Sequence, residues 1–275
     1  MSFYTSLNGL KNAQTDLGVI SHNIANAETT GFKKSRTEFA DIVVGSAFTN
    51  PKLVVGIGAA VESINQNFAL GPIEQTGSAL DVAINGDGFF TTKNVVTGQT
   101  LFTRNGSLTV DGAGYISDGS GNRLQVFPTD AAGTITSTTP ADALIPATNG
   151  TDANGNPIEF AGITLGDDGA VTASYADGSN VIIGKVALAS FIAPQGLKQV
   201  GSSNWVTTGI SGAPTFGQPS TGQYGSLLSG ALERSNVDIA EELVSLITAQ
   251  RNFQANAKAI DTATQISQTV IQLQT

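Results

Sequence analysis

Hydrophobic positions follow a helical period at the two ends of the chain, whereas in the middle they form short runs separated by turn dipeptides. Near the N-terminus the apolar residues recur at spacings of three, four and seven. They are Phe3, Leu7, Leu10, Leu17, Ile20 and Ile24. This stripe predicts an N-terminal helix, and Gly31 stands where such a helix and the segment after it can turn.

The C-terminal segment predicts a second and longer helix. Asp238 followed by Glu241 resembles a capping box, and acidic residues suit the positive end of the helix dipole. Neither Gly nor Pro occurs in residues 231–275, so one helix of up to about 35 residues is expected. Its apolar residues keep a near-helical spacing at Leu243, Ile247, Ala257, Ile260, Val270 and Ile271.

The C-terminal helix is poor in charge. After Arg251 the charged residues are Lys258 and Asp261, and the rest are Gln, Thr, Ser, Asn and aliphatic residues. A solvated surface helix normally carries many charges on its outer face. This composition therefore predicts a helix with protein on more than one side.

The middle of the chain, about residues 54–229, predicts an antiparallel β domain. Short apolar runs end in Asn-Gly or Asp-Gly dipeptides, which supply the positive φ that tight hairpins need. The dipeptides are Asn85-Gly86, Asp111-Gly112, Asp118-Gly119, Asp168-Gly169 and Asp177-Gly178. Residues 128–161 are rich in Thr, Ala, Pro, Asn and Gly and are too short for an independent domain, so a loop-like insertion is expected there.

Together these elements predict an α+β fold. The N- and C-terminal helices are expected to pair as a coiled-coil-like domain, beside a mainly antiparallel β-rich domain. The expected division is a helix in 1–30, a connecting region in 31–70, the β-rich domain in 71–230 and a helix in 231–275. Periodicity alone leaves two alternatives open. The helices either assemble with other subunits, or pack on each other and on the sheet of a monomer.

Composition narrows the function classes. The net charge is −9, and nucleic-acid binding favours a basic stripe, so no nucleic-acid partner is expected. The chain has no cysteine, which excludes disulfides and thiolate catalysis, and its single histidine, His22, cannot form a multi-histidine metal site. No run of about 18 apolar residues exists, so no membrane insertion is expected, and the start shows no ordinary secretory signal.

Two glycine-rich or acidic segments imitate ligand-binding loops. Residues 178–185 have five residues between their glycines where a P-loop needs four, so a hairpin is the better interpretation. Residues 152–156 resemble the start of a calcium loop, but Pro157 stands where glycine is required. Neither segment predicts a site.

Three further candidates also have simpler interpretations. His22 lies in the predicted N-terminal helix with no G-x-S-x-G motif nearby, and residues 167–168 predict a turn. The basic cluster of Lys33, Lys34 and Arg36 is matched by nearby acids, and a solvated face is expected. We therefore predict no catalytic residue, no cofactor and no metal, and do not expect an enzyme.

Three parts of the chain resemble the bacterial flagellar rod and hook protein family. In residues 21–33 the family pattern N-N-x-A-N-x-x-T-x-G-[FY] is matched by Asn23, Ala25, Asn26, Thr29, Gly31 and Phe32, with His22 in place of the first Asn. Residues 80–90 with 102–106, and residues 230–238 with 249–253, match further segments in the family's order. The similarity covers most of the chain.

The resemblance implies a subunit of a tubular helical polymer, with the terminal helices in an inner tube and the β-rich part outside. Among family members the chain is most similar to the hook subunit, which transmits torque from rod to filament. A distal rod subunit is the first alternative, and a secreted β-rich binding protein is the second. The extra outer domain of longer hook proteins has no counterpart in 128–161.

The resemblance also implies partners and location. The partners are further copies of the chain and the distal rod, hook cap and hook–filament junction proteins. The location is the flagellar hook or basal body, reached through the type III export apparatus without a cleaved signal. The assembly interface is expected to contain Leu7, Leu10, Leu17, Ile24, Leu243, Ile247, Ile260 and Val270.

Overall fold

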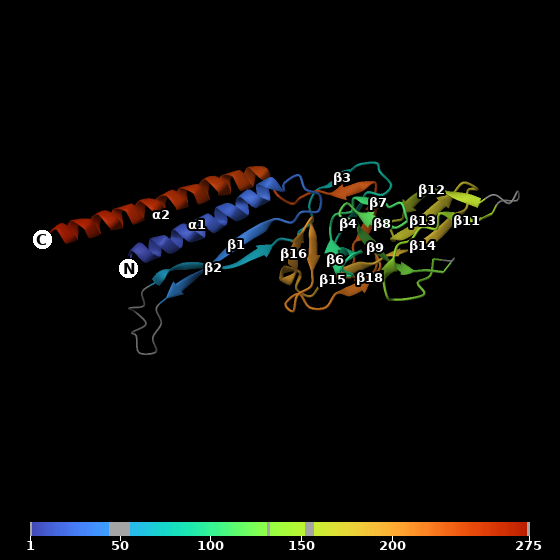
Figure 1. Cartoon of the computed structure of the whole chain (residues 1–275), viewed down its shortest axis with the longest axis horizontal. Helices are drawn as coiled ribbons and strands as arrows, with labels where there is room; N and C mark the ends of the chain where they lie inside the picture. Colours follow the sequence, from blue (N-terminus) through green and yellow to red (C-terminus); the bar gives the residue numbers. More distant parts are fainter. Residues whose placement is uncertain (1, 44–55, 131–132, 152–156, 274–275) are drawn as a thin grey trace. The chain divides into compact units, whose positions relative to one another are not determined.

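The computed structural model describes residues 2–43, 56–130, 133–151 and 157–273. These residues form two compact units, drawn in Figure 1. Unit 1 consists of Met1–Ala27, Lys34–Asn67 and Val237–Thr275, and unit 2 consists of Glu28–Lys33 and Phe68–Asn236. Each unit is therefore built from segments far apart in the sequence.

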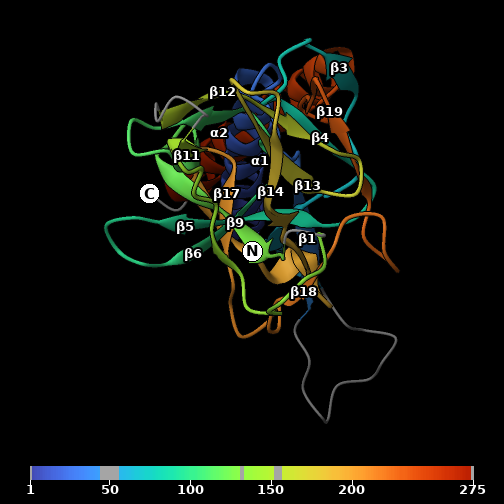
Figure 2. The same ribbon diagram turned by 90° about the vertical axis from the view of Figure 1, so that its right-hand side faces the viewer.

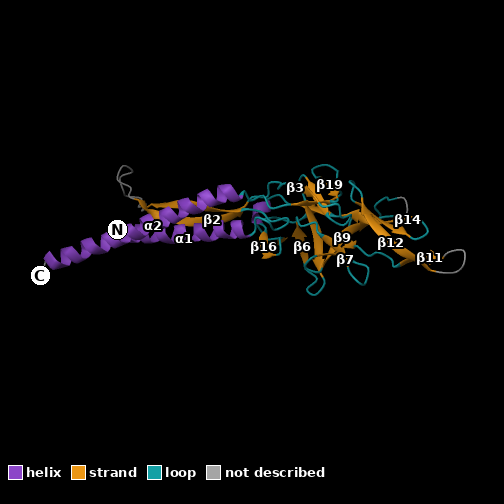
Figure 3. Cartoon of the chain, turned by 90° about the horizontal axis from the view of Figure 1, so that it is seen from above, coloured by secondary structure: helices purple, strands orange, loops and turns teal. Residues whose placement is uncertain are grey.

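Unit 1 contains the two predicted helices and one β-hairpin. The helices are α1 (Ser2–Ala25) and α2 (Ile239–Leu273), and the strands are β1 (Ser35–Val43) and β2 (Gly56–Gln66). The helices pack against each other with opposite directions (Figures 1 and 3). Asn23 Nδ2 donates to Glu242 Oε2 at one end, and a Cβ added to Gly9 would lie 2.5 Å from Asn256 Oδ1 nearer the other. The α part of the predicted fold is confirmed, and the coiled-coil geometry stays a prediction.

Helix α1 also packs against the hairpin. β1 pairs antiparallel with β2, and Asn12 Nδ2 on α1 donates to Ala59 O on β2 at 2.8 Å. Ile20 of the predicted N-terminal stripe is buried, and so is Ala13, which lies seven residues before it on the same side of the helix. Residues 31–70, expected as a connecting region, thus contain both strands of unit 1.

The start of α2 is capped as the sequence predicts. Asp238 Oδ1 accepts hydrogen bonds from the backbone N–H groups of Ala240 and Glu241, at 2.8 and 3.2 Å. These bonds satisfy two of the free N–H groups of the first turn. The helix then runs for 35 residues.

Unit 2 is an antiparallel β structure. One sheet of 14 strands contains the path β11-β12-β13-β14-β9-β5-β6-β17-β16, to which β7, β8, β10, β15 and β18 are joined, and β4–β19 and β3–β20 form separate pairs. The predicted β-rich middle is confirmed. The bounds are β3 (Ile73–Gln75), β4 (Val82–Asn85), β5 (Phe89–Asn94), β6 (Thr100–Thr103), β7 (Leu108–Val110), β8 (Ile116–Asp118), β9 (Asn122–Pro128), β10 (Ala141–Asp142), β11 (Thr148–Thr151), β12 (Pro157–Leu165), β13 (Ala170–Tyr175), β14 (Asn180–Val186), β15 (Leu188–Ser190), β16 (Lys198–Gly201), β17 (Asn204–Val206), β18 (Thr215–Gly217), β19 (Ser226–Ser229) and β20 (Ala231–Glu233), with a short 3-10 helix at Pro194–Gly196.

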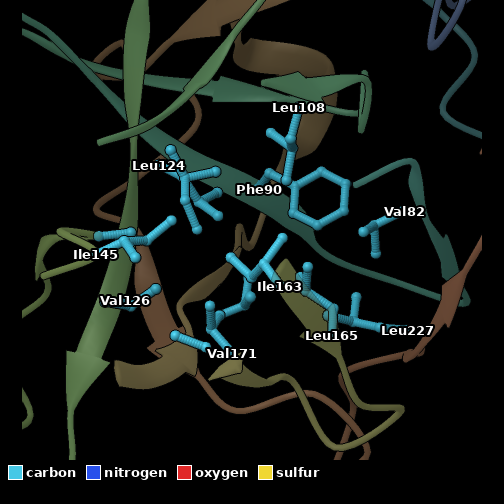
Figure 4. Packing of buried hydrophobic residues seen from close by; sticks show 14 of the residues in the cluster. Val82, Phe90, Leu108, Leu124, Val126, Ile145, Ile163, Leu165, Val171 and Leu227 are labelled. Atoms are coloured by element: carbon cyan, nitrogen blue, oxygen red, sulfur yellow. The ribbon is translucent and has the colours of Figure 1, made fainter. Parts of the chain in front are cut away.

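Two hydrophobic clusters form the core of unit 2. Figure 4 shows the larger one, in which aliphatic side chains from β4, β9, β12, β13 and β19 surround Phe90. The second is aromatic: Phe89, Phe102, Phe191 and Trp205 pack edge to face, with Phe68 against them. Edge-to-face pairs of this kind add to the stabilisation from burial alone.

The turn dipeptides predict some hairpins correctly and one wrongly. Gly169 and Gly178 have φ of 82° and 80° in the β12–β13 and β13–β14 hairpins. Asn85-Gly86 ends β4, but β4 pairs with the distant β19 and not with the next strand. Residues 128–161, expected as a loop-like insertion, contain β10, β11 and the start of β12.

Candidate assembly surface

Helix α2 exposes a row of aliphatic side chains on a face that α1 does not cover. Ile239, Leu243 and Ile247 are spaced four residues apart and are 44–50% exposed, and the neighbouring Val244 is 66% exposed. Residues four apart lie on one side of a helix. We call Ile239, Leu243 and Ile247 the outer row. Ala249, by contrast, is buried, so α2 has one apolar side packed within unit 1 and another that is open.

The C-terminal end of α2 extends past the start of α1. The contacts of Asn23 with Glu242 and of Gly9 with Asn256 fix the antiparallel register. Continued at the same rate, this register places residue 263 opposite the start of α1, which leaves 264–273 beyond it. Ile266 and Ile271 in this stretch are more than half exposed. Helix α2 thus has two further exposed aliphatic side chains near its C-terminal end.

The predicted interface residues fall into two groups. Leu243 and Ile247 belong to the outer row. Five others are half-buried, namely Leu7, Leu10, Leu17, Ile24 and Ile260. The eighth, Val270, lies in α2, and its side chain is outside the described part of the structure.

Asn23, matched in the sequence only through the family pattern, joins three elements of unit 1. Its Nδ2 donates to Ser35 O at 2.8 Å and to Glu242 Oε2 at 3.1 Å, and its Oδ1 accepts from Ser35 N at 3.0 Å. The buried amide therefore links α1 to the start of β1 and to α2, and all of these bonds are shielded from water.

Lys34 supports the same junction. Its Nζ lies 2.8 Å from Glu242 Oε1 and 3.2 Å from Glu241 Oε2. Burial lowers the pKa of Lys34, but the hydrogen bonds to Glu242 and Glu241 outweigh this and raise the pKa above its usual value.

Gly31 has a defined place in unit 2. Its φ is 67°, its N–H donates to Glu233 O at 2.8 Å, and an added Cβ would lie 2.6 Å from Asn105 N. Glycine adopts this conformation without strain, and no side chain has room. The other pattern residues are the exposed Ala25, the partly exposed Asn26 and Thr29, and the buried Phe32.

A buried charge cluster in unit 2 corrects the expectation for Lys33. Lys33 and Glu233 are fully buried, and the Lys33 ammonium donates to Glu233 Oε1 and to Ala69 O. Arg104 Nη1 approaches Glu233 Oε2 at 3.3 Å, and Gly71 N donates to Oε1 at 2.9 Å. The predicted solvated face is wrong for Lys33 because its acidic partner stands 200 residues away in the sequence.

Burial shifts the pKa of both cations in this cluster. Loss of solvation lowers the pKa of Lys33, although the attraction and hydrogen bond of Glu233 oppose the shift. Burial likewise lowers the pKa of Arg104, against the attraction of Glu233 and Asp87. The cluster is therefore stable as a charged group only while the carboxylate is present.

The other sequence candidates lie at separate places in the described structure. His22 is exposed on α1, and Asp168 pairs with Lys185 in the hairpin region of 167–185. Residues 152–156 lie outside the described residues. No group of three or more His, Asp or Glu in the described ranges could hold a metal ion, and no described helix is long and apolar enough to cross a membrane.

Family models match three parts of the chain. Residues 3–33 match "Flagella basal body rod protein", residues 83–173 match "Flagellar hook protein FlgE/F/G D1 domain", and residues 228–273 match "Flagellar basal body rod FlgEFG protein C-terminal". The first and last matches contain the predicted helices, and the middle match lies in unit 2.

Curated relatives match the chain from end to end. The flagellar basal-body rod protein FlgG of Bacillus subtilis is 35% identical over 285 residues, covering 99% of this chain and 98% of the relative. FlgG of Agrobacterium fabrum is 31% identical over 95% of both chains. The flagellar hook protein FlgE of Escherichia coli is 28% identical over 408 residues, covering 99% of this chain and all of the relative. With its paired end helices and β-rich middle, the chain belongs to the flagellar rod and hook protein family.

Proposed function

We propose that this chain is the hook subunit of the flagellum and polymerises with copies of itself into a helical tube that transmits torque from rod to filament. The observation that carries the polymerisation is the outer row of α2. Three aliphatic side chains on one side of a helix are about half exposed, while another side of the same helix is packed on α1. A monomer gains nothing from such a row, but a neighbouring subunit can enclose it.

The magnitude of this contact is modest for a single pair of subunits. Full burial of an aliphatic side chain stabilises by about 1.5–3 kcal/mol, so enclosing the exposed halves of three side chains contributes roughly 3 kcal/mol. Association costs at least about 4 kcal/mol. Val244, Ile266 and Ile271, also exposed, must add to the contact, or each helix must meet several neighbours. A heterologous interface that does not close produces such a filament.

The half-buried part of the predicted interface has a different role in this proposal. Leu7, Leu10, Leu17 and Ile24 on α1, with Ile260 on α2, hold unit 1 together. Leu243 and Ile247 then contact other subunits, and Val270 stays a predicted contact. Helix α2 therefore serves the fold on one side and the polymer on the other.

The comparisons do not separate hook from rod. Bacillus FlgG is 35% identical over 285 residues and Escherichia FlgE is 28% identical over 408 residues, and both alignments cover 99% of this chain. The hook is proposed on the resemblance of residues 249–253 to the hook protein.

A distal rod subunit is the second candidate, favoured by length. FlgG relatives cover 99% of this chain and are themselves covered to 98–99%, so their length is close to that of this chain. A deletion strain separates the two. A missing hook subunit leaves complete rods without hooks, whereas a missing distal rod subunit stops assembly before the rod is finished.

Polymerisation is tested with purified protein by sedimentation and electron microscopy. Wild-type chain is expected to form tubes at high concentration, and Leu243→Asp is expected to remain in the supernatant. Leu243→Met, which keeps an apolar side chain of similar size, is the matched control and is expected to polymerise. Tubes of Leu243→Asp at the wild-type concentration would contradict the proposal.

The export route and the partners at the two ends of the tube, both implied by the resemblance, belong to the same proposal. Secretion by the type III apparatus is checked in an export-deficient strain.

A further inference from the structure

The chain passes repeatedly between its two units, and it does so next to three short segments of unit 2. Unit 2 consists of residues 28–33 and 68–236, so the chain enters or leaves this unit at both ends of each range. We call residues 28–33, 68–72 and 233–236 the crossing segments, because these passages lie at their ends. The covalent connections from unit 1 into unit 2 therefore run through the crossing segments.

Glu233, in the third crossing segment, contacts both of the others. Its Oε1 accepts hydrogen bonds from Lys33 Nζ and from Gly71 N, and its backbone carbonyl accepts from Gly31 N at 2.8 Å. Lys33 Nζ also donates to Ala69 O at 2.8 Å. A buried carboxylate and a buried ammonium thus join three segments, two of which lie 200 residues apart in the sequence.

Arg234 joins the same segments at the surface of unit 2. Its guanidinium pairs with Glu28 of the first segment and with Glu74 of β3, and its backbone N–H donates to Pro72 O at 2.8 Å. A Cβ added to Gly71 would lie 2.2 Å from Arg234 O, so the second and third segments touch through their backbones. β3 follows the second segment and pairs antiparallel with β20, which ends in the third (β3 is labelled in Figure 2). The segments are therefore tied outside as well as inside.

The tied segments are also attached to the body of unit 2. Arg104 directly follows β6, and its Nη1 lies 3.3 Å from Glu233 Oε2 while its guanidinium lies over the Phe89 ring at 5.3 Å. Ser203, in the turn between β16 and β17, donates from its Oγ to Thr30 O at 3.0 Å. These contacts connect the crossing segments to the aromatic cluster and to a second hairpin.

Folding stability alone does not explain three charges at this place. A buried ion cluster contributes little net stability over well-packed apolar residues of similar volume. Directional bonds between separate chain segments have a different effect. A single peptide connection yields to torque because rotation about φ and ψ absorbs it. Segments that are bonded to one another beside the passages cannot rotate or slide singly.

We propose that Lys33, Glu233 and Arg104, with Arg234 at the surface, form a clamp that holds the crossing segments together, so that a load on unit 1 enters the β-rich body through all of them at once. The clamp deepens the proposed function and rests on it, because a subunit that transmits torque needs such a junction. It is a property of one subunit and requires no second copy.

Force spectroscopy on single molecules of the full chain tests the clamp, because the chain has no cysteine and thiol handles can be placed freely. Handles at Lys11→Cys in α1 and Thr138→Cys in an exposed loop of unit 2 apply the load through the crossing segments. Handles at Thr138→Cys and Ala176→Cys, in the exposed β13–β14 turn, apply it inside the β-rich body. The measured quantity is the lifetime of folded unit 2 at constant force.

Lys33→Met is the test variant, because it removes the ammonium that bonds to both other segments and leaves Glu233 paired with Arg104. Lys185→Met removes the pair with Asp168 far from the passages in the sequence and is the matched control. With the load applied through unit 1, Lys33→Met is expected to shorten the lifetime at least about tenfold, or about 1.4 kcal/mol of barrier, and with the load inside unit 2 less than about threefold. Lys185→Met should show no such difference between the two directions.

Arg234→Met keeps the test decisive if Lys33→Met does not fold. The Arg234 side chain is 38% exposed, so this variant should melt almost like the wild type and still lose lifetime under load through unit 1. Equal lifetime losses with both handle pairs, or none with either variant, would overturn the clamp and leave polymerisation intact. A failure of the wild-type chain to form tubes would instead contradict the proposed function.

Discussion

Replacement of Glu233 by Gln removes the only carboxylate that contacts both Lys33 and Arg104 within the described residues. Glu233 and Lys33 are fully buried and Arg104 is 3% exposed, so the variant leaves two cations in a dry site. Removing one partner of a buried ion pair destabilises by about 3–5 kcal/mol. For a domain of this size, each kcal/mol of destabilisation lowers the melting temperature by about 2–4 °C. Glu233→Gln is therefore expected to lower the melting temperature of unit 2 by roughly 6–20 °C.

The assay uses the single tryptophan of the chain. Trp205 is fully buried in the aromatic cluster of unit 2, so its fluorescence reports the unfolding of that unit. The control is Glu74→Gln. Glu74 pairs with Arg234, the residue after β20, but its side chain is 57% exposed, and surface ion pairs contribute about 1 kcal/mol at most. Equal losses in the two variants would refute the view that Lys33, Arg104 and Glu233 stabilise unit 2 as a buried cluster.

Three further changes test local features of unit 2 with the same fluorescence assay. Gly31→Ala is expected to destabilise by at least about 1–2 kcal/mol, because φ is 67° and the new Cβ would press on Asn105 N; an unchanged midpoint would show that the backbone relaxes freely. Ser202→Asn is expected to raise the midpoint slightly, since φ at this turn residue is 51° and Asn tolerates that conformation better than Ser; a lower midpoint would count against it. The hydrogen bond from Lys185 lowers the pKa of Asp168 in the folded state, so its stabilisation is present above the unfolded value near 3.8 and is lost as pH falls through the folded pKa. Lys185→Met should therefore lose less stability than the wild type between pH 5 and pH 2. Equal losses in the two proteins would show that Lys185 does not lower the pKa of Asp168.

The helices were predictable because their signals are local. The stripe through Leu7, Leu17 and Ile24 and the cap at Asp238 each depend on residues within a few turns of one another, and the structure has both helices where these signals stand. The low charge of α2 predicted a helix with protein on more than one side, which stays a prediction. Ile260 and Leu243 could not be assigned to different sides from spacing alone, because that requires the position of α1.

The pairings between distant segments were not predictable from spacing. Asn85-Gly86 has the composition of a hairpin turn, yet β4 pairs with β19, whose residues come about 140 positions later. Lys33 has ordinary charged neighbours in the sequence, and only the fold brings Glu233 and Arg104 to it.

Thiol labelling of Leu243→Cys measures whether the outer row of α2 becomes buried between subunits. The side chain at this position is 46% exposed, and no other thiol exists in the chain. A maleimide dye should label the unassembled protein rapidly and label tubes at least about tenfold more slowly, while Thr138→Cys is labelled at the same rate in both. Equal labelling of Leu243→Cys in tubes and in unassembled protein would show that subunits do not enclose this row.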